Sequence, residues 1–336
     1  MNKVLSWNSM QEIRIICELD DIKTENTNDR AYGAYYEVYI TQDSLSYSIN
    51  TEKLATRFRS SDHPPFEYFR DHLSLNIRNE LNDKGYRMSN SELAVTQIRD
   101  ALQYPIYSKL RNKLANIAVH YLFNTSYNSP LRNSQPIGWA GPDPDIPSTR
   151  LSYNGDNLSN VFYHLHNEPK YQDYYDEILF TLRRAFPSFE EIVFPPDLGQ
   201  GQTILAWKDK NFPKRAITAN LLSDGALRFM CLLAALYDPK PPALICFDEP
   251  EVGLHPQLIR LLASVLQEAS ERMQIIVATH SAELISSLSS VEDVIVVEEE
   301  EGWSKLKRLS QSDLAHWLEE YSLGELWESG EIGGRL

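Results

Sequence analysis

The chain has 336 residues, of which 42% are hydrophobic and 24% are charged, so it can bury one large core or two smaller ones. Its net charge of −15 argues against a strong sequence-independent grip on nucleic acid, because such a grip depends on clustered Lys and Arg. The sequence has no run of about 18 apolar residues and no leader-like pattern over Met1–Met10. It therefore gives no sign of a membrane span or of secretion, and the cytoplasm is the expected location. Cys17, Cys231 and Cys246 are widely spaced in apolar segments, which favours reduced core thiols over a disulfide frame or a zinc site.

The N-terminal part predicts strands and then helices. Antiparallel strands are expected within residues 1–60, at Glu12–Leu19, Ala34–Ile40 and Leu45–Ile49. Two sets of apolar residues then have helical spacing: Phe66, Phe69, Leu73 and Ile77, and Leu110, Leu114, Ile117 and Tyr121. We interpret residues 61–150 as a helical insertion followed by a Pro-rich surface loop over 124–150.

Residues 151–336 alternate apolar strands with amphipathic helices. The expected helices are Asn157–Leu165, Tyr174–Ala185, one that begins at Ser223, and Pro256–Glu271. The expected strands are Glu191–Phe194, Thr203–Trp207, Ala243–Phe247, Gln274–Ala278 and Asp293–Val297. This alternation predicts an α/β fold with a parallel sheet covered by helices on both faces. Functional residues of such a sheet are expected at its carboxyl edge.

The segment Ala243–Pro250 is an apolar strand that ends in two adjacent carboxylates, the pattern called Walker B. Asp248 is expected to bind magnesium, largely through water, because this hard cation keeps part of its hydration shell. Glu249 is expected to orient or deprotonate an attacking water. Taken alone, the triplet Asp-Glu-Pro also fits an ordinary turn.

Two further segments point to a nucleotide. Ser223 is a good N-cap, and Gly225 in the first helical turn leaves room for an anion at the backbone amides. His280 follows the strand Gln274–Ala278 at the same sheet edge and can sense a γ-phosphate by hydrogen bonding. Singly, these residues also fit a capped helix and a structural histidine, but their order and common placement favour a shared site.

Ser-Asp-Gly, an apolar strand with Asp-Glu-Pro-Glu-x-Gly-Leu-His-Pro, and Thr-His-Ser together resemble the RecF/SMC-like ATPases of the ABC class, specifically bacterial AAA family ATPases. The resemblance covers about residues 150–336, including Asp156–Leu158 and the tail Ser322–Trp327, and covers residues 1–150 only loosely. It implies an ABC-type P-loop NTPase head in which ATP and Mg²⁺ are bound between two subunits.

The resemblance also implies residue roles. Ser223, Asp224 and Gly225 would be nucleotide-binding signature residues, in a Ser-Asp-Gly form where transporter cassettes have Ser-Gly-Gly. Asp248 would be the magnesium-associated acid and Glu249 the catalytic base. His255 would be a D-loop residue that faces the second subunit, and His280 the switch histidine.

A Walker A loop needs Gly-x-x-x-x-Gly-Lys followed by Ser or Thr, but none of the 14 glycines precedes a lysine. Gly199–Thr203 is the nearest glycine-rich segment, and it lacks the lysine. We therefore expect that the family's first strand, phosphate loop and helix are missing from this chain through a late start codon, a frameshift or a split gene.

Three functions remain open at this point. The first is an ATP-hydrolysing head that dimerises, in DNA repair or phage defence. The alternative is a non-catalytic subunit that supplies signature and D-loop surfaces to a separate P-loop protein. The third is a component of a nuclease-linked defence or repair system. Its nuclease activity is then expected in another protein, because about 55 residues after His280 leave no room for a fused nuclease domain.

Overall fold

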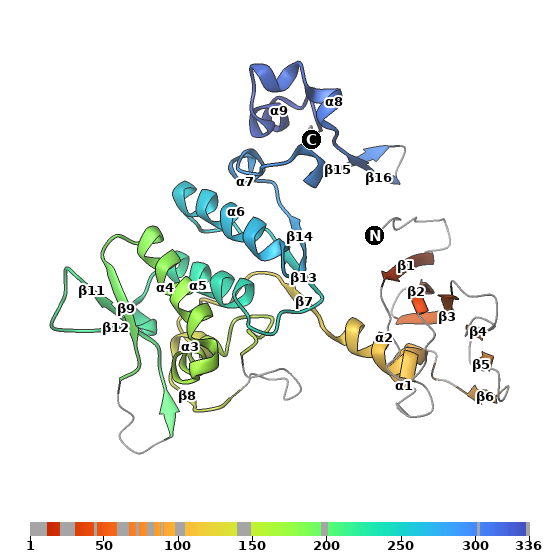
Figure 1. The fold of residues 1–336 in the computed structure, drawn as a ribbon, viewed down its shortest axis with the longest axis horizontal. Helices are drawn as coiled ribbons and strands as arrows, with labels where there is room; N and C mark the ends of the chain where they lie inside the picture. The colour runs from red at the N-terminus through yellow and green to blue at the C-terminus, as the bar shows by residue number, and fades with distance from the viewer. Residues whose placement is uncertain are drawn as a thin grey trace. The chain divides into compact units, whose positions relative to one another are not determined.

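The computed structural model describes residues 12–20, 31–43, 46–58, 67–71, 74–78, 84–87, 89, 91–97, 105–139, 149–195, 201–300 and 303–333. The chain divides into two compact units, Met1–Ala115 with Ile295–Lys307, and Asn116–Val294 with Arg308–Leu336. Figure 1 shows the elements of both units, coloured along the chain.

The first unit contains a six-stranded antiparallel sheet in which each strand pairs with the next one along the chain. Its strands are β1 (Glu12–Asp20), β2 (Ala31–Asp43), β3 (Ser46–Phe58), β4 (Glu67–Asp71), β5 (Ser74–Arg78) and β6 (Lys84–Arg87). The helices α1 (Ala94–Gln97) and α2 (Pro105–Ala115) follow, and β15 (Ile295–Glu300) pairs with β16 (Trp303–Arg308). The predicted N-terminal antiparallel meander is confirmed.

The helix predicted from Phe66, Phe69, Leu73 and Ile77 is wrong. Phe69 lies on β4 and Ile77 on β5, and these two strands pair with each other; Phe66 and Leu73 lie outside the described residues. The apolar spacing of three to four residues arose because the chain turns back between two short strands, so each strand contributes only part of the pattern.

Glu52 on β3 is a fully buried carboxylate that joins the sheet to α1. It accepts hydrogen bonds from the Tyr36 hydroxyl at 2.9 Å and from the backbone amides of Ala94 and Val95 at 2.6 and 3.1 Å. The first amides of a helix have no partner within the helix, so this carboxylate satisfies two of them and stabilises the helix dipole.

The second unit is a mixed α/β assembly. Its strands are β7 (Ile117–His120), β8 (Gln135–Pro136), β9 (Phe189–Val193), β10 (Gln202–Thr203), β11 (Ala206–Asp209), β12 (Ile217–Thr218), β13 (Leu244–Asp248) and β14 (Gln274–Ala278). Its α-helices are α3 (Leu158–Asn167), α4 (Gln172–Ala185), α5 (Asp224–Leu236), α6 (Pro256–Ser270), α7 (Ala282–Ser286), α8 (Gln311–Leu314) and α9 (Leu323–Ser329). The 3₁₀ turns η1 (Pro130–Arg132) and η3 (Ala219–Leu221) matter for the site below.

The strands β7, β13 and β14 form a parallel sheet with β13 in the middle. Parallel strands need crossover connections, and α6 supplies the one between β13 and β14. The α/β fold with a parallel sheet flanked by helices, predicted from the sequence, is thus confirmed.

Two strand predictions need correction. Ile117 and Tyr121 were assigned to a helical face, but α2 ends at Ala115, and Ile117 begins β7 beside β13. The segment Asp293–Val297 was expected in the parallel sheet, whereas β15 begins at Ile295 and pairs with β16 in a separate two-stranded sheet. The β-branched residues Ile117 and Val119 were the available signal for β7.

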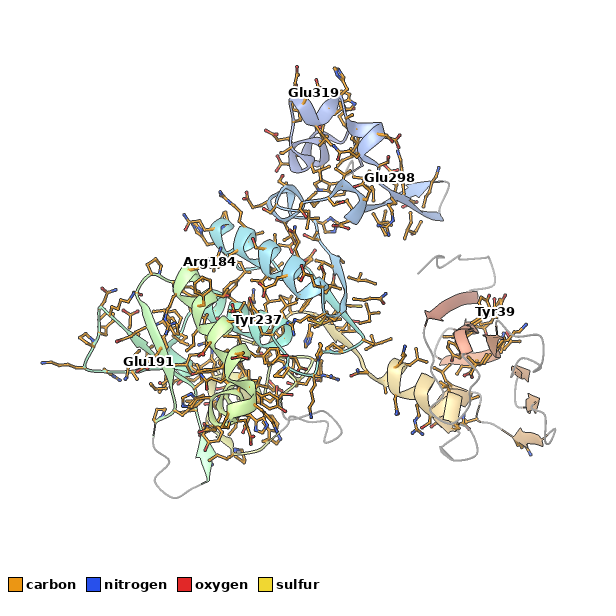
Figure 2. The ribbon with its side chains drawn as sticks, viewed as in Figure 1. Tyr39, Arg184, Glu191, Tyr237, Glu298 and Glu319 are labelled. Atoms are coloured by element: carbon orange, nitrogen blue, oxygen red, sulfur yellow. The ribbon has the colours of Figure 1, made fainter. Side chains whose placement is uncertain are left out.

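One face of the parallel sheet packs on the main hydrophobic core. Ile245 and Phe247 of β13 are buried there, with Ile275 and Val277 of β14 packed against the same cluster. Helix α5 is buried almost all round, and α6 contributes one apolar face. Tyr237, just after α5, lies inside this core and donates a hydrogen bond to Glu268 of α6 at 3.3 Å (Figure 2).

The opposite face of the sheet is open over the described residues. Side chains alternate along strands, and the pairing aligns Val119, Cys246 and Ile276 across this face. Val119 and Ile276 are 38% and 47% exposed, and Cys246 is half-buried. We call these three residues the open face. Within the described residues of the second unit, helices therefore cover only one of the two faces that were expected to be covered.

The cysteine prediction holds for one of three residues. Cys231 is fully buried in α5, and burial raises the pKa of its thiol. Cys246 lies on the open face, and the side chain of Cys17 lies outside the described set. Within the described ranges, no helix has the length and apolar character needed to cross a membrane.

His120, the last residue of β7, is held neutral in the core. Its ring stacks on Phe247 at a centroid distance of 5.5 Å, and its Nδ1 lies 3.2 Å from the carbonyl oxygen of Tyr153. Burial lowers the pKa of His120 from 6.5 to about 4, because the imidazolium would lose its hydration there.

This shift predicts a loss of stability in acid. Between pH 6.5 and about 4 the unfolded chain binds a proton at His120 that the folded chain does not, so the free energy of unfolding falls as pH falls. The contribution is about 3 kcal/mol over this window. Urea unfolding across the window should show a weaker pH dependence for His120→Phe than for wild type. A matched change at exposed His316 to Gln should leave the slope unchanged, and an unchanged slope in His120→Phe would refute the assignment.

Candidate functional site

The carboxyl end of β13 carries the two predicted acids. Asp248 is exposed and, by strand alternation, lies on the same side as Cys246 of the open face. Glu249 is half-buried, and its backbone amide donates a hydrogen bond to the carbonyl oxygen of Ala278 at 2.8 Å. The turn Glu249–Gly253, the predicted Walker B turn, is therefore attached to the end of β14.

Glu249 has a left-handed backbone conformation, with φ of +47°. A non-glycine residue in this region costs roughly 1–2 kcal/mol, and such strain is found disproportionately at functional positions. Here the strained residue lies between the last residue of β13 and Pro250.

A second bond joins Glu251 of this turn to Thr279–Ser281, the predicted switch segment. The Thr279 hydroxyl donates to Glu251 Oε1 at 2.5 Å and accepts from the backbone amide of Ser281 at 2.9 Å. His280 lies between these two residues and is exposed. Its ring is 6.4 Å from that of Trp327 on α9, centroid to centroid. The sequence motifs that contain Glu249 and His280 are thus joined by side-chain and backbone hydrogen bonds.

Helix α5, the predicted signature helix, begins after Ser223 as predicted. The Ser223 hydroxyl accepts a hydrogen bond from the backbone amide of Ala226 at 3.2 Å, which is an N-cap contact. Ser223 and Asp224 are exposed. A Cβ at Gly225 would lie 2.9 Å from the carbonyl oxygen of Gly253, so this glycine permits close contact with the turn Glu251–Pro256, the predicted D-loop turn. That contact gives Gly225 a packing role besides the expected approach to an anion.

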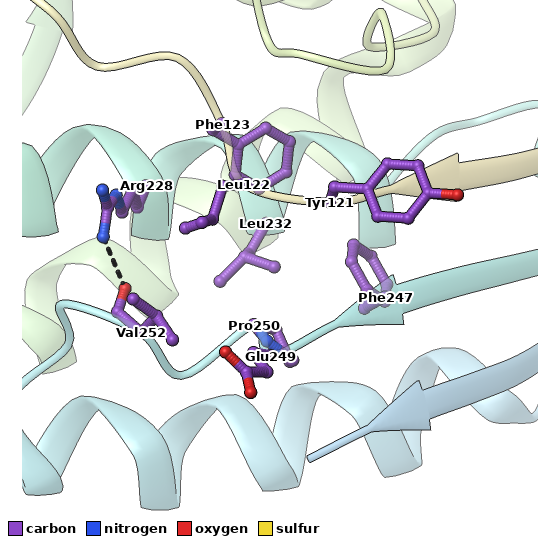
Figure 3. Close-up of a pocket in the computed structure, with 9 residues that line it drawn as sticks. All are labelled: Tyr121, Leu122, Phe123, Arg228, Leu232, Phe247, Glu249, Pro250 and Val252. Atoms are coloured by element: carbon purple, nitrogen blue, oxygen red, sulfur yellow. Dashed lines mark hydrogen bonds between the residues drawn. The ribbon is translucent and has the colours of Figure 1, made fainter. Parts of the chain in front are cut away.

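Arg228, which sequence reasoning missed, holds the D-loop turn on α5. Its Nη1 donates to the carbonyl oxygen of Val252 at 2.8 Å. Gly253 has φ of +79°, and a Cβ there would lie 2.4 Å from the same Nη1. Figure 3 shows this bond at one side of a hollow, with Phe247 and Tyr121 at the other side and Glu249 between them. The hollow is lined by Tyr121, Leu122, Phe123, Arg228, Leu232, Phe247, Glu249, Pro250 and Val252.

His255 is the N-cap of α6. Its Nδ1 accepts a hydrogen bond from the backbone amide of Gln257 at 3.3 Å, and its ring is exposed. An accepting Nδ1 leaves Nε2 as the protonated nitrogen of the neutral ring, available to a donor role on the surface. The predicted contact of His255 with a second subunit stays a prediction.

Arg132 is another residue that the sequence reasoning missed. It is 7% exposed and belongs to η1, far from α5 in sequence. Its guanidinium forms a salt bridge with Asp224 and donates to the carbonyl oxygen of Leu222 at 2.7 Å. A buried arginine is therefore part of the structure around the signature triplet.

The donors and acids present fit magnesium-bound nucleotide. Over the described residues, no group of three or more His, Cys, Asp or Glu could hold a metal. Magnesium needs no such cage, because it is usually held by one or two carboxylates together with water and substrate phosphates. Exposed Asp248 suits that role. The glycine-rich segment Gly199–Thr203 contributes nothing comparable: residues 199–200 lie outside the described set, and Thr203 pairs in β10 with β8.

Comparison with protein families gives one match. Residues 145–286 match the family described as "AAA domain, putative AbiEii toxin, Type IV TA system". The matched segment contains Ser223, Asp248, Glu249, His255 and His280. The resemblance to AAA family ATPases is thereby confirmed. A search of curated proteins finds no match.

Several solved structures are similar to the chain at low identity. The SMC head domain from Thermotoga maritima is 12% identical to this chain. The match covers 87% of this chain and 78% of the Thermotoga chain, with a TM-score of 0.36. An Smc head domain bound to the C-terminal domain of ScpA, derived from Pyrococcus furiosus, is 11% identical, with coverage of 85% and 80% and a TM-score of 0.41. An SmcHead bound to the C-winged helix domain of ScpA is 12% identical, with coverage of 86% and 78% and a TM-score of 0.42.

The contact between α5 and the D-loop turn predicts a glycine requirement. Gly253→Ala should lower the free energy of unfolding by more than the ~1 kcal/mol of left-handed strain, because the added Cβ would displace the Arg228 guanidinium and weaken its hydrogen bond to Val252. Gly138→Ala is the matched control: Gly138 has φ of +84° but no atom near its Cβ position, so only the strain of about 1 kcal/mol applies. Equal losses in the two variants, measured by urea unfolding, would show that the contact is not tight.

Proposed function

We propose that this chain, whose AAA domain spans residues 145–286, provides the signature and Walker B lobe of an ABC-type ATPase. One observation carries the proposal: Walker B, switch, D-loop and signature segments are joined directly to one another. Glu249 bonds to the end of β14, Glu251 to Thr279, and Arg228 to Val252.

Each residue has a role in this proposal. Bound magnesium would offset charge on the phosphates of ATP, and Asp248 would hold it, mainly through water. Glu249 would accept a proton from water or orient it. The α5 amides beyond Ser223 and Gly225 would contact phosphate, His280 would hydrogen-bond to it, and His255 would face a second subunit.

The open face supports the need for one more strand and helix. Connections between parallel strands of one sheet are right-handed in nearly all proteins. The β13–α6–β14 connection covers the face of Ile245 and Phe247. Consider a further strand that pairs with β14 and precedes β7 in the chain. The connection from that strand to β7 would cross the sheet in the direction opposite to the β13–β14 connection. Its helix would therefore cover Val119, Cys246 and Ile276.

That strand and helix match what a Walker A element is: a strand, a phosphate loop and a helix. We propose that such an element completes the site at the free edge of β14. Asp248, on the side of the open face, would then lie on the side from which the phosphate loop approaches. The element can belong to the same polypeptide or be supplied by another one. The alternative raised from the sequence is different: there the chain is a non-catalytic subunit that supplies signature and D-loop surfaces to a separate P-loop protein.

The wider setting follows from the resemblance and remains part of the proposal. It is DNA repair or phage defence in the cytoplasm, with two heads closing over ATP. The net charge of −15 favours contact with DNA through other subunits.

The base role of Glu249 predicts a specific defect. In the protein supplied with a strand–Gly-x-x-x-x-Gly-Lys-Ser–helix element, Glu249→Gln should lower single-turnover ATP hydrolysis by at least about 100-fold and leave ATP binding intact. Glu271→Gln, at an exposed glutamate after α6, is the control and should hydrolyse ATP normally. Normal hydrolysis by Glu249→Gln would rule out the base assignment.

The docking of the strand and helix predicts a surface effect. Ile276→Lys should weaken binding of the added element by at least about 10-fold, because a charge would be buried on the open face. The lobe should still fold, since Ile276 is half exposed. Phe212→Lys, at an exposed aromatic after β11, is the control. Calorimetric titration measures both, and equal affinities would contradict docking on the open face.

A further inference from the structure

Arg132 binds the segment that leads into the signature helix. Its Nη1 lies 2.7 Å from the carbonyl oxygen of Leu222 and 3.2 and 3.4 Å from those of Ala219 and Asn220. Its Nε donates to the carbonyl oxygen of Thr125 at 2.7 Å. The residue is 7% exposed, so these bonds form away from bulk water. One guanidinium therefore fixes η3 and the residue before Ser223 relative to the loop after β7.

The remaining Nη2 forms the salt bridge with Asp224. Asp224 is the first residue of α5, and a carboxylate there is favoured by the helix dipole. The same negative charge would repel a phosphate that approached the α5 amides. An adjacent arginine offsets this charge, so the helix N-terminus stays compatible with an anion.

We infer that Arg132 is a positioning residue for the signature triplet, and that Asp224 serves as its ion-pair partner instead of contacting nucleotide. This inference rests on the proposed function and revises the nucleotide-binding role that the resemblance implied for Asp224. It also accounts for the Ser-Asp-Gly form: the aspartate is tolerated beside phosphate because Arg132 is bonded to it.

The inference separates two roles of Arg132 that substitutions can resolve. Its bonds to backbone carbonyls do not need Asp224, whereas its charge compensation does. Arg132→Lys keeps a positive charge but cannot span the carbonyl oxygens of Thr125 and Leu222 together, because lysine lacks the planar fork of donors. Arg132→Met removes both roles, and Asp224→Gly removes the need for compensation.

The experiment measures KM and kcat for ATP in the protein supplied with the P-loop element. Arg132→Met should raise KM by at least about 10-fold, because an unpaired carboxylate remains beside the phosphate. Asp224→Gly alone should leave KM within about threefold, and the double variant should recover most of the KM lost in Arg132→Met. A double variant no better than Arg132→Met, or an Asp224→Gly variant with a 10-fold higher KM, would overturn the inference.

A second readout needs no nucleotide. Amide hydrogen exchange over residues 219–226 should accelerate by at least about 10-fold in Arg132→Lys. This variant is used because it is milder than Arg132→Met and keeps the positive charge. Exchange in α3 should stay at the wild-type rate. If wild type fails to bind ATP, the proposed function fails but this readout still decides the positioning role: unchanged exchange over residues 219–226 overturns it.

Discussion

The pairing of β13 on both sides is the constraint on which the site depends. Because β7 and β14 both run parallel to it, all three strands end at the same edge. The register aligns Asp248 with Ala278, and the next amide, that of Glu249, bonds to Ala278. His280 therefore lies two residues after Ala278, whose carbonyl oxygen is bonded to the amide of Glu249. A slip of one residue would exchange the two faces of the sheet and bury Asp248.

Helix α5 adds the signature segment to this edge through small residues. Gly225 allows the first turn of α5 to contact the turn after β13, because a Cβ there would lie 2.9 Å from the carbonyl oxygen of Gly253. Gly253 leaves room for the guanidinium of Arg228. Arg228 bonds to the same turn, and Arg132 holds the segment before α5. The N-terminus of α5 and the turn after β13 are thus parts of one packed unit.

The sequence predicted the elements that carry this edge well. The strand Gln274–Ala278, the cap at Ser223 and the acids after β13 are found where their patterns indicated, because each is determined by local apolar runs and capping chemistry. β7 was missed because four residues are too short to show a period and the preceding helix supplied a false one. Arg132, Arg228 and the Thr279–Glu251 bond depend on contacts distant in sequence, which no local pattern reveals.

The central claim is that the phosphate loop is brought by a strand that pairs with β14 and a helix that covers the open face. Cys246 is a native probe of that face, since its thiol is half-buried between Val119 and Ile276. The direct measurement is the rate of Cys246 alkylation, read by peptide mass spectrometry, with and without the P-loop element and Mg-ATP. The account predicts that the rate falls by at least about 10-fold when the element binds. An unchanged rate in a protein that hydrolyses ATP would contradict it.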